Sequence, residues 1–327
     1  MKTRQTLLLA SVLLPVTIAS AHAEVKVIAS IKPVHSLVAA IMEGAGEPGL
    51  VVEGASSPHT YSLKPSQAAA LQDADVIFWI GERLETFLEK PIKTIGEKTK
   101  AVELIDAYGM ETLGFRAGGA FETHMHDEGH TDTDDDHGEE HAAEDEHGHE
   151  HDHDDIDMHV WLDPVNARAM AQEIAGTLAG SDPDNAALYQ ANAAALSARL
   201  DALTTELAAE LEPVRGTGYI VFHDAYQYFE RRFGLTPAGS ITVSPDVMPG
   251  ADRLREIQTK VRELSATCVF AEPQFEPKLV TVAIEGSEAR SAVLDPLGAE
   301  IAAGPDLYFD VLRGMAASFK GCLADAS

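Results

Sequence analysis

Short apolar segments alternate with helical segments in two separate parts of the chain, and this alternation limits the fold more than any other feature. Reading hydrophobic periodicity, we predict strands at residues 25–29, 50–52, 76–80 and 101–105, and again at 219–222, 268–271 and 292–294. Helices are predicted between them, including 65–71, 225–233, 250–264, 277–284 and 306–323. Strands of this length that alternate with helices favour parallel sheets, so we predict an α/β fold with two α/β lobes.

One unusually long segment rich in alanine and leucine, residues 183–212, separates the two alternating parts. Such residues are strong helix formers, and we interpret the segment as a rigid helix that braces two lobes. The predicted organisation is a first lobe at 24–180, a linking helix at 181–210 and a second lobe at 211–327. Ligands of parallel sheets bind at the carboxyl ends of the strands, which places the expected binding site in the cleft between the lobes.

The amino terminus has the pattern of an export signal. Lys2 and Arg4 precede an apolar run at residues 7–18, which ends in Ala21-His22-Ala23, a small-residue cleavage pattern. We predict that residues 1–23 are a signal peptide, and that the mature protein begins at Glu24 in the periplasm. A run of about a dozen apolar residues is too short to span a membrane, which takes roughly 20. The cleavage site carries no cysteine, so no lipid anchor is expected.

Cys268 and Cys322 are the two cysteines of the chain. Because disulfides persist in oxidising compartments, an exported protein with two distant cysteines favours a disulfide over a metal site. We therefore predict a Cys268–Cys322 bond that fastens the C-terminal helix.

The formal net charge of -29 argues against nucleic acid and anionic membrane surfaces as partners, since both would be repelled. Much of the charge lies between residues 122 and 157, which hold seventeen acidic residues and no lysine or arginine. This segment has no hydrophobic periodicity and cannot bury enough apolar surface to fold, so we predict a disordered acidic loop.

The acidic loop also carries nine histidines, and tracts of this composition bind metals weakly in several stoichiometries. We interpret the loop as an auxiliary metal-binding loop; the alternative is a solvated linker with no specific role. The histidines are His124, His126, His130, His137, His141, His147, His149, His151 and His153.

Three further histidines stand at the ends of predicted elements. His59 follows the strand at 50–52, His159 precedes the segment Val160-Trp161-Leu162, and His223 follows the strand at 219–222. Element ends are where an α/β lobe gathers ligand groups, and neutral imidazole is a favoured zinc ligand. Each histidine taken alone fits an ordinary residue that is hydrogen-bonded to the backbone at a strand end, and spacing does not decide between these interpretations.

The segments around these histidines, 54–66, 157–164 and 222–229, together with 294–298, resemble the metal-binding solute-receptor family of ABC transporters. The resemblance is closest to its zinc-uptake branch, because of the acidic His-rich insertion before His159 and the C-terminal cysteine pair. It implies two α/β lobes joined by a rigid helix, a metal between the lobes, and delivery to a membrane permease with a cytoplasmic ATPase. A monomer is expected.

The resemblance also implies the ligands. His59 and His159 would come from the first lobe and His223 from the second. Some zinc receptors carry a glutamate just before the first histidine, but Pro58 stands there and cannot ligate. Manganese-binding relatives use an aspartate at the position of Asp295, so either Asp295 or a water would complete the tetrahedron.

Ligand chemistry favours zinc, because three imidazoles suit zinc, copper or nickel, whereas manganese prefers more oxygen ligands. We expect Zn²⁺ as the transported substrate. The alternatives are a manganese or iron receptor of the same family, a zinc storage protein, and a zinc metallohydrolase. The last of these is disfavoured because the chain shows no His-Glu-x-x-His motif or other general-base signature, so we expect no enzyme activity.

Overall fold

The computed structural model describes residues 25–96, 98–116, 121, 156–242, 250–263, 268–276 and 278–324. The predicted signal peptide and the nine histidines of the acidic loop lie outside these residues. Within the described part of the chain, no helix has the length and apolar character needed to cross a membrane.

The first lobe is built on a four-stranded parallel sheet in the order β2-β1-β3-β4. The central strands β1 and β3 are buried along their whole length, as expected for a parallel sheet that helices cover on both faces. The elements of this lobe are β1 (Val27–Ala29), α1 (Lys32–Met42), β2 (Gly49–Leu50), α2 (Pro65–Asp73), β3 (Val76–Trp79), α3 (Thr86–Ile95), β4 (Lys100–Glu103) and the short 3-10 helix η1 (Leu104–Asp106).

The second lobe repeats this plan with the parallel strand order β6-β5-β7-β8. Its elements are β5 (Tyr219–His223), α6 (Gln227–Phe233), β6 (Pro237–Thr242), α7 (Ala251–Glu263), β7 (Cys268–Ala271), α8 (Lys278–Ile284), β8 (Arg290–Val293) and α9 (Leu307–Leu323). The prediction of two α/β lobes with parallel sheets is therefore confirmed. Strand β6 was not predicted, because its sequence Pro-Ala-Gly-Ser-Ile-Thr lacks an apolar run.

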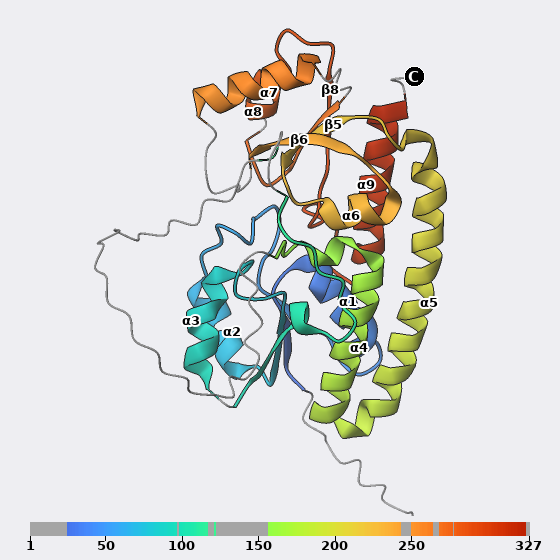
Figure 1. Cartoon of the computed structure of the whole chain (residues 1–327). Coiled ribbons are helices and arrows are strands. Elements are labelled where there is room, and N and C mark those ends of the chain that lie inside the picture. The colour runs from blue at the N-terminus through green and yellow to red at the C-terminus, as the bar shows by residue number, and fades with distance from the viewer. Residues whose placement is uncertain are drawn as a thin grey trace, which may run out of the picture.

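A long helix joins the lobes, as predicted. Helix α5 (Ala186–Leu211) runs past both lobes along one edge of the molecule (Figure 1). It packs against α4 (Pro164–Ser181) and α1 of the first lobe and against α9 of the second. Three further 3-10 helices, η2 (Val160–Leu162), η3 (Pro183–Asn185) and η4 (Glu212–Val214), lie before α4 and at the two ends of α5.

The apolar core is continuous between the lobes. One cluster of buried residues includes the faces of α1 and α4, the leucines of α5, and the aromatic side chains of α6 and α9. Because α9 belongs to the second lobe in sequence and packs on α1 of the first, separation of the lobes would expose this shared core. A second, smaller cluster lies beneath α7 and α8 on the other face of the second sheet.

The predicted disulfide is present between Cys268 in β7 and Cys322 in α9. It ties the C-terminal helix, which also packs on the first lobe, to the central part of the second sheet.

Replacing both cysteines by serine should lower the free energy of unfolding by about 4 kcal/mol, the chain-entropy value for a closed loop of this length. The two cysteines are 54 residues apart, so the bond closes a large loop in the unfolded chain and lowers the conformational entropy of the unfolded ensemble. Urea denaturation of the parent and the double serine variant measures the difference, with the reduced parent as a control. Equal midpoints for all three proteins would show that the bond contributes little.

Candidate metal site

Three chain segments bring the histidines to the interface of the lobes. His59 lies in the irregular segment between β2 and α2, and His223 is the last residue of β5. His159 stands immediately before η2, just upstream of α4. His159 and His223 are 6% and 3% exposed, and His59 is partly buried. The structure therefore brings together the three histidines that the sequence placed at the ends of elements.

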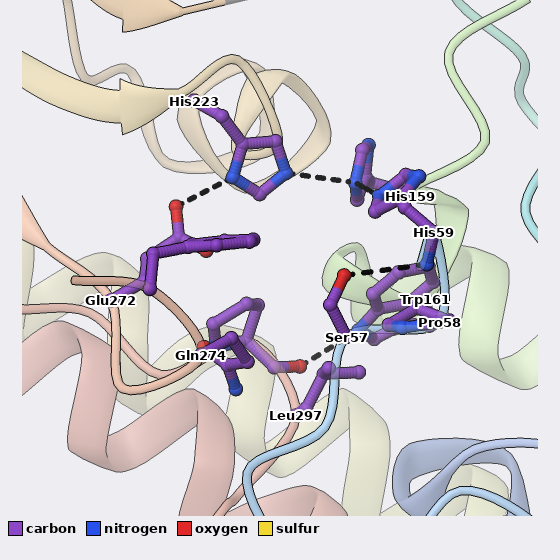
Figure 2. Close-up of a pocket in the computed structure, with 11 residues that line it drawn as sticks. Ser57, Pro58, His59, His159, Trp161, His223, Glu272, Gln274 and Leu297 are labelled. Atoms are coloured by element: carbon purple, nitrogen blue, oxygen red, sulfur yellow. Dashed lines mark hydrogen bonds and ion pairs between the residues drawn. The ribbon is translucent and has the colours of Figure 1, made fainter. Parts of the chain in front are cut away.

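The three imidazoles turn toward one another, as Figure 2 shows, with their ligand atoms within 4.8 Å of one another. The Nε2 atom of His159 lies 3.3 Å from Nε2 of His59 and 3.3 Å from Nε2 of His223. In a tetrahedral zinc site with Zn–N bonds of about 2.05 Å, neighbouring ligand atoms are about 3.3 Å apart. Two of the three spacings thus match the edge of a zinc tetrahedron, and the ligand atoms of the third pair lie within 4.8 Å of each other.

Buried carboxylates hold two of the rings from behind. Nδ1 of His159 lies 2.7 Å from Oδ1 of Asp157, and Nδ1 of His223 lies 2.6 Å from Oε1 of Glu272. Both carboxylates are almost completely buried. A carboxylate that accepts from Nδ1–H leaves the lone pair of Nε2 free, so both rings present the nitrogen that faces the other histidines.

The electrostatics differ between the rings. Burial lowers the pKa of His59 well below 6.5, and the neighbouring His159 and His223 lower it further. The imidazole of His59 is thus held in the neutral form that binds a metal. Burial also lowers the pKa of His223, but the charge and hydrogen bond of Glu272 outweigh it, so that the pKa of His223 is raised from 6.5.

The cavity beside the histidines is small. Its volume is about 10 Å³, close to the roughly 10–15 Å³ that one water needs. The wall is largely apolar and is formed by residues of both lobes, which are Ser57, Pro58, Trp161, Glu272, Gln274, Phe275, Pro296 and Leu297. One water or a ligand of similar size fits beside the histidines in this space.

Asp295 does not belong to the histidine group. Its Oδ1 accepts hydrogen bonds from the backbone N–H groups of Leu297 and Gly298 and from the side-chain amide of Gln274. Its Oδ2 accepts from the backbone N–H of Ala299 at 2.6 Å. Both oxygens are therefore used to hold the turn after β8, and the structure does not place Asp295 as the fourth ligand that the sequence analysis considered.

Comparison with known proteins identifies the family. A family model described as "Zinc-uptake complex component A periplasmic" matches residues 27–322. A high-affinity zinc uptake system protein ZnuA from Brucella suis biovar 1 (strain 1330) is 54% identical over 316 residues, which cover 91% of each chain. The chain belongs to the ZnuA family. A second ZnuA, from Yersinia pestis, is 35% identical over 328 residues and covers 98% of this chain and 97% of its own.

Solved structures agree with the fold of the ZnuA family. A ZnuA deletion mutant with zinc bound superposes with a TM-score of 0.72 at 26% identity, covering 92% of this chain and 99% of its own. The periplasmic zinc-binding protein TroA from Treponema pallidum has a TM-score of 0.75 at 17% identity, covering 92% and 100%. At this lower identity, TroA shows a shared fold alone.

In this member of the ZnuA family, sequence reasoning did not find Glu272. A single acidic residue among many carries little signal, but Glu272 directly follows β7, as His223 ends the neighbouring strand β5. Because the carboxyl ends of parallel strands share one edge of the sheet, this placement was the available signal. Asp157 was noted only as part of a motif, and its hydrogen bond to His159 is visible only in three dimensions.

Proposed function

We propose that this protein captures one Zn²⁺ in the periplasm with His59, His159 and His223, and delivers it to the membrane permease of an ABC transporter with a cytoplasmic ATPase. The observation that carries the proposal is the convergence of three imidazoles, two of whose Nε2–Nε2 distances are 3.3 Å and all of whose ligand atoms lie within 4.8 Å of one another. The names of the relatives support zinc as the substrate. Zinc is here the cargo, and the protein acts as its carrier.

The fourth corner of the tetrahedron is assigned to a water. Asp295 is engaged with the backbone of its own turn, and Pro58 has no ligand atom in its side chain. The cavity beside the histidines has the volume of one water. Release to the permease then requires the loss of three imidazole bonds and one exchangeable ligand.

The alternatives are less well supported. The structures of the binding protein FpvC contain Ni²⁺ and Mn²⁺, but FpvC is only 18–19% identical and indicates the fold alone. Three imidazoles without a carboxylate ligand suit zinc better than manganese. A metallohydrolase would need a general base beside the metal, and the chain carries no general-base signature. A zinc storage role would depend on the histidines of the acidic loop, which lie outside the described part of the chain.

A zinc titration of the mature protein that lacks residues 122–155 tests the proposal. We expect one tightly bound zinc, because all three histidines and both supporting carboxylates remain. The same protein with His59, His159 and His223 all changed to alanine is the matched control, and it should bind no tight zinc. If the deletion variant held no tight zinc, the loop would be the principal binder and the proposed site would be wrong.

A further inference from the structure

Lys32, the first residue of α1, connects the first lobe to the second. Its ammonium Nζ donates to the carbonyl oxygens of Gly298, Ala299 and Ile301 at 2.5, 3.1 and 2.7 Å. Only 7% of the residue is exposed. A lysine ammonium has three N–H donors, so these bonds use all of its capacity.

The segment that Lys32 holds, which we call the 295–301 loop, follows β8 in the second lobe and forms one wall of the metal cavity. Pro296 and Leu297 line the cavity beside the histidines. The Asp295 carboxylate accepts from three successive backbone N–H groups of this loop, so the turn is stiffened from within. The loop therefore has a fixed internal shape, and side chains of the first lobe attach it to that lobe.

Two side chains of the first lobe make that attachment. The indole Nε1 of Trp161 donates to the carbonyl oxygen of Pro296 at 2.9 Å. Lys32 supplies the other three hydrogen bonds. Because its ammonium is charged, these bonds are about twice as strong as hydrogen bonds between neutral groups. Lys32 thus makes most of the polar contact between the loop and the first lobe.

The apolar core that the two lobes share limits how an ion can leave the site. Because α9 and α5 bury apolar side chains against the first lobe, separating the lobes as whole bodies would expose a large apolar area. Displacement of one wall of the metal cavity exposes far less apolar area. An ion that leaves the site therefore escapes more readily when a wall moves than when the lobes separate.

We propose that Lys32 is a positioning residue that holds the 295–301 loop against the first lobe and thereby slows the escape of zinc from the cavity. The inference rests on the proposed function, since it assumes that zinc occupies the histidine site. Lys32 does not touch the metal and acts only through the wall that it holds.

The Lys32→Met variant tests this role in the full mature chain loaded with one zinc. Zinc release is followed after mixing with excess EDTA and a fluorescent zinc indicator. We expect release at least about tenfold faster than from the parent, because loss of even one charged buried hydrogen bond corresponds to a factor of that order. Lys32→Arg retains the charge and should release zinc faster than the parent but more slowly than Lys32→Met.

The matched control is Lys100→Met. The Nζ atom of Lys100 donates to Oγ1 of Thr177 inside the first lobe, away from the cavity. This variant should release zinc at the parental rate. Parental release from Lys32→Met would overturn the inference, whereas a parent that holds no tight zinc would overturn the proposed function instead.

Hydrogen exchange at the backbone amides of residues 297–301 provides a second measurement, which a purely global effect on stability would not reproduce. Exchange should quicken in this loop in both Lys32 variants and remain unchanged in Lys100→Met. If Lys32→Met fails to fold, the Lys32→Arg variant decides the question. Parental exchange in the loop together with parental zinc release in Lys32→Arg would then refute the inference.

Discussion

Replacing His223 by alanine should weaken zinc binding at the histidine site about 100- to 1,000-fold. Structural zinc sites bind with roughly 10–16 kcal/mol, which divided among four ligands is about 2.5–4 kcal/mol for each. A loss of that size corresponds to between two and three orders of magnitude in the dissociation constant. His223 is also the ligand that the second lobe contributes, so its removal leaves the ion attached to the first lobe alone.

Competition with a chelator of known affinity measures this effect, and the deletion of residues 122–155 keeps the loop histidines from masking it. His35→Ala is the matched control. His35 is a buried histidine of α1 whose Nε2 contacts the carbonyl oxygen of Pro48, outside the metal site. Its loss should lower stability and leave zinc affinity within a few fold of the parent, since packing around α1 changes while the ligands do not.

Asp295→Asn separates the two assignments of the fourth ligand. Because Asp295 holds the backbone of its own turn, we expect a much smaller loss of zinc affinity than in His223→Ala. The opposite ranking, with zinc retained in His223→Ala and lost in Asp295→Asn, would contradict the assignment made here and restore Asp295 as a ligand.

The elements with strong hydrophobic periodicity were predictable from the sequence. The apolar strands β3 and β7 and the leucine-rich α5 were located to within a few residues. Strand β6 was missed because its backbone is held by pairing with β5, while its side chains carry no apolar pattern. A strand of this kind is defined by its neighbour and not by its own residues.

The candidate site was predictable only in part. The ends of the predicted elements made His59, His159 and His223 candidates, and the resemblance of the surrounding segments to the metal-binding receptor family selected them as ligands. Which acidic residue serves which histidine could not be predicted, because it depends on distances between segments far apart in the chain. Asp295 was expected near the metal and holds a turn, whereas Glu272 was not singled out and contacts His223 at 2.6 Å.

The attachment of α9 to the first lobe also could not be predicted from the sequence. Periodicity predicted the helix and the compartment rule predicted its disulfide, but neither indicates which surface the apolar face of a helix covers. In the structure, the backbone N–H of Tyr308 donates to Oγ of Ser36 in α1, and the Tyr308 hydroxyl donates to the carbonyl oxygen of Trp161. The C-terminal helix thus supports the first lobe beside the residues that lead to the metal site.

Replacing the carboxylates behind the histidines should have the second largest effect on zinc binding. We expect Glu272→Gln and Asp157→Asn each to weaken zinc affinity about 10- to 100-fold, the usual cost of losing a partner that orients a ligating histidine. A neutral amide still offers an oxygen to Nδ1–H, but without the charge that strengthens the bond of the imidazole to the metal. Chelator competition on the loop-deleted protein measures both variants.

Glu85→Gln is the matched control for this pair. Glu85 is also a fully buried carboxylate, but it accepts hydrogen bonds from Oγ of Ser30 and from the backbone N–H groups of Ile80 and Gly81, and it contacts no histidine. Burial raises the pKa of Glu85 to about 7, so this carboxyl is already about half neutral at pH 7 and the amide removes only part of a charge. This variant should alter stability and leave zinc affinity unchanged.

The double variant of Glu272 and Asp157 tests whether the two carboxylates act independently. They hold different rings, His223 in the second lobe and His159 in the first, and each contacts its own Nδ1. If each carboxylate only orients its own imidazole, the two losses of binding free energy should add. A double variant no weaker than either single one would mean that loss of one oriented ring already disables the site, and the lobes would then bind zinc as a single unit.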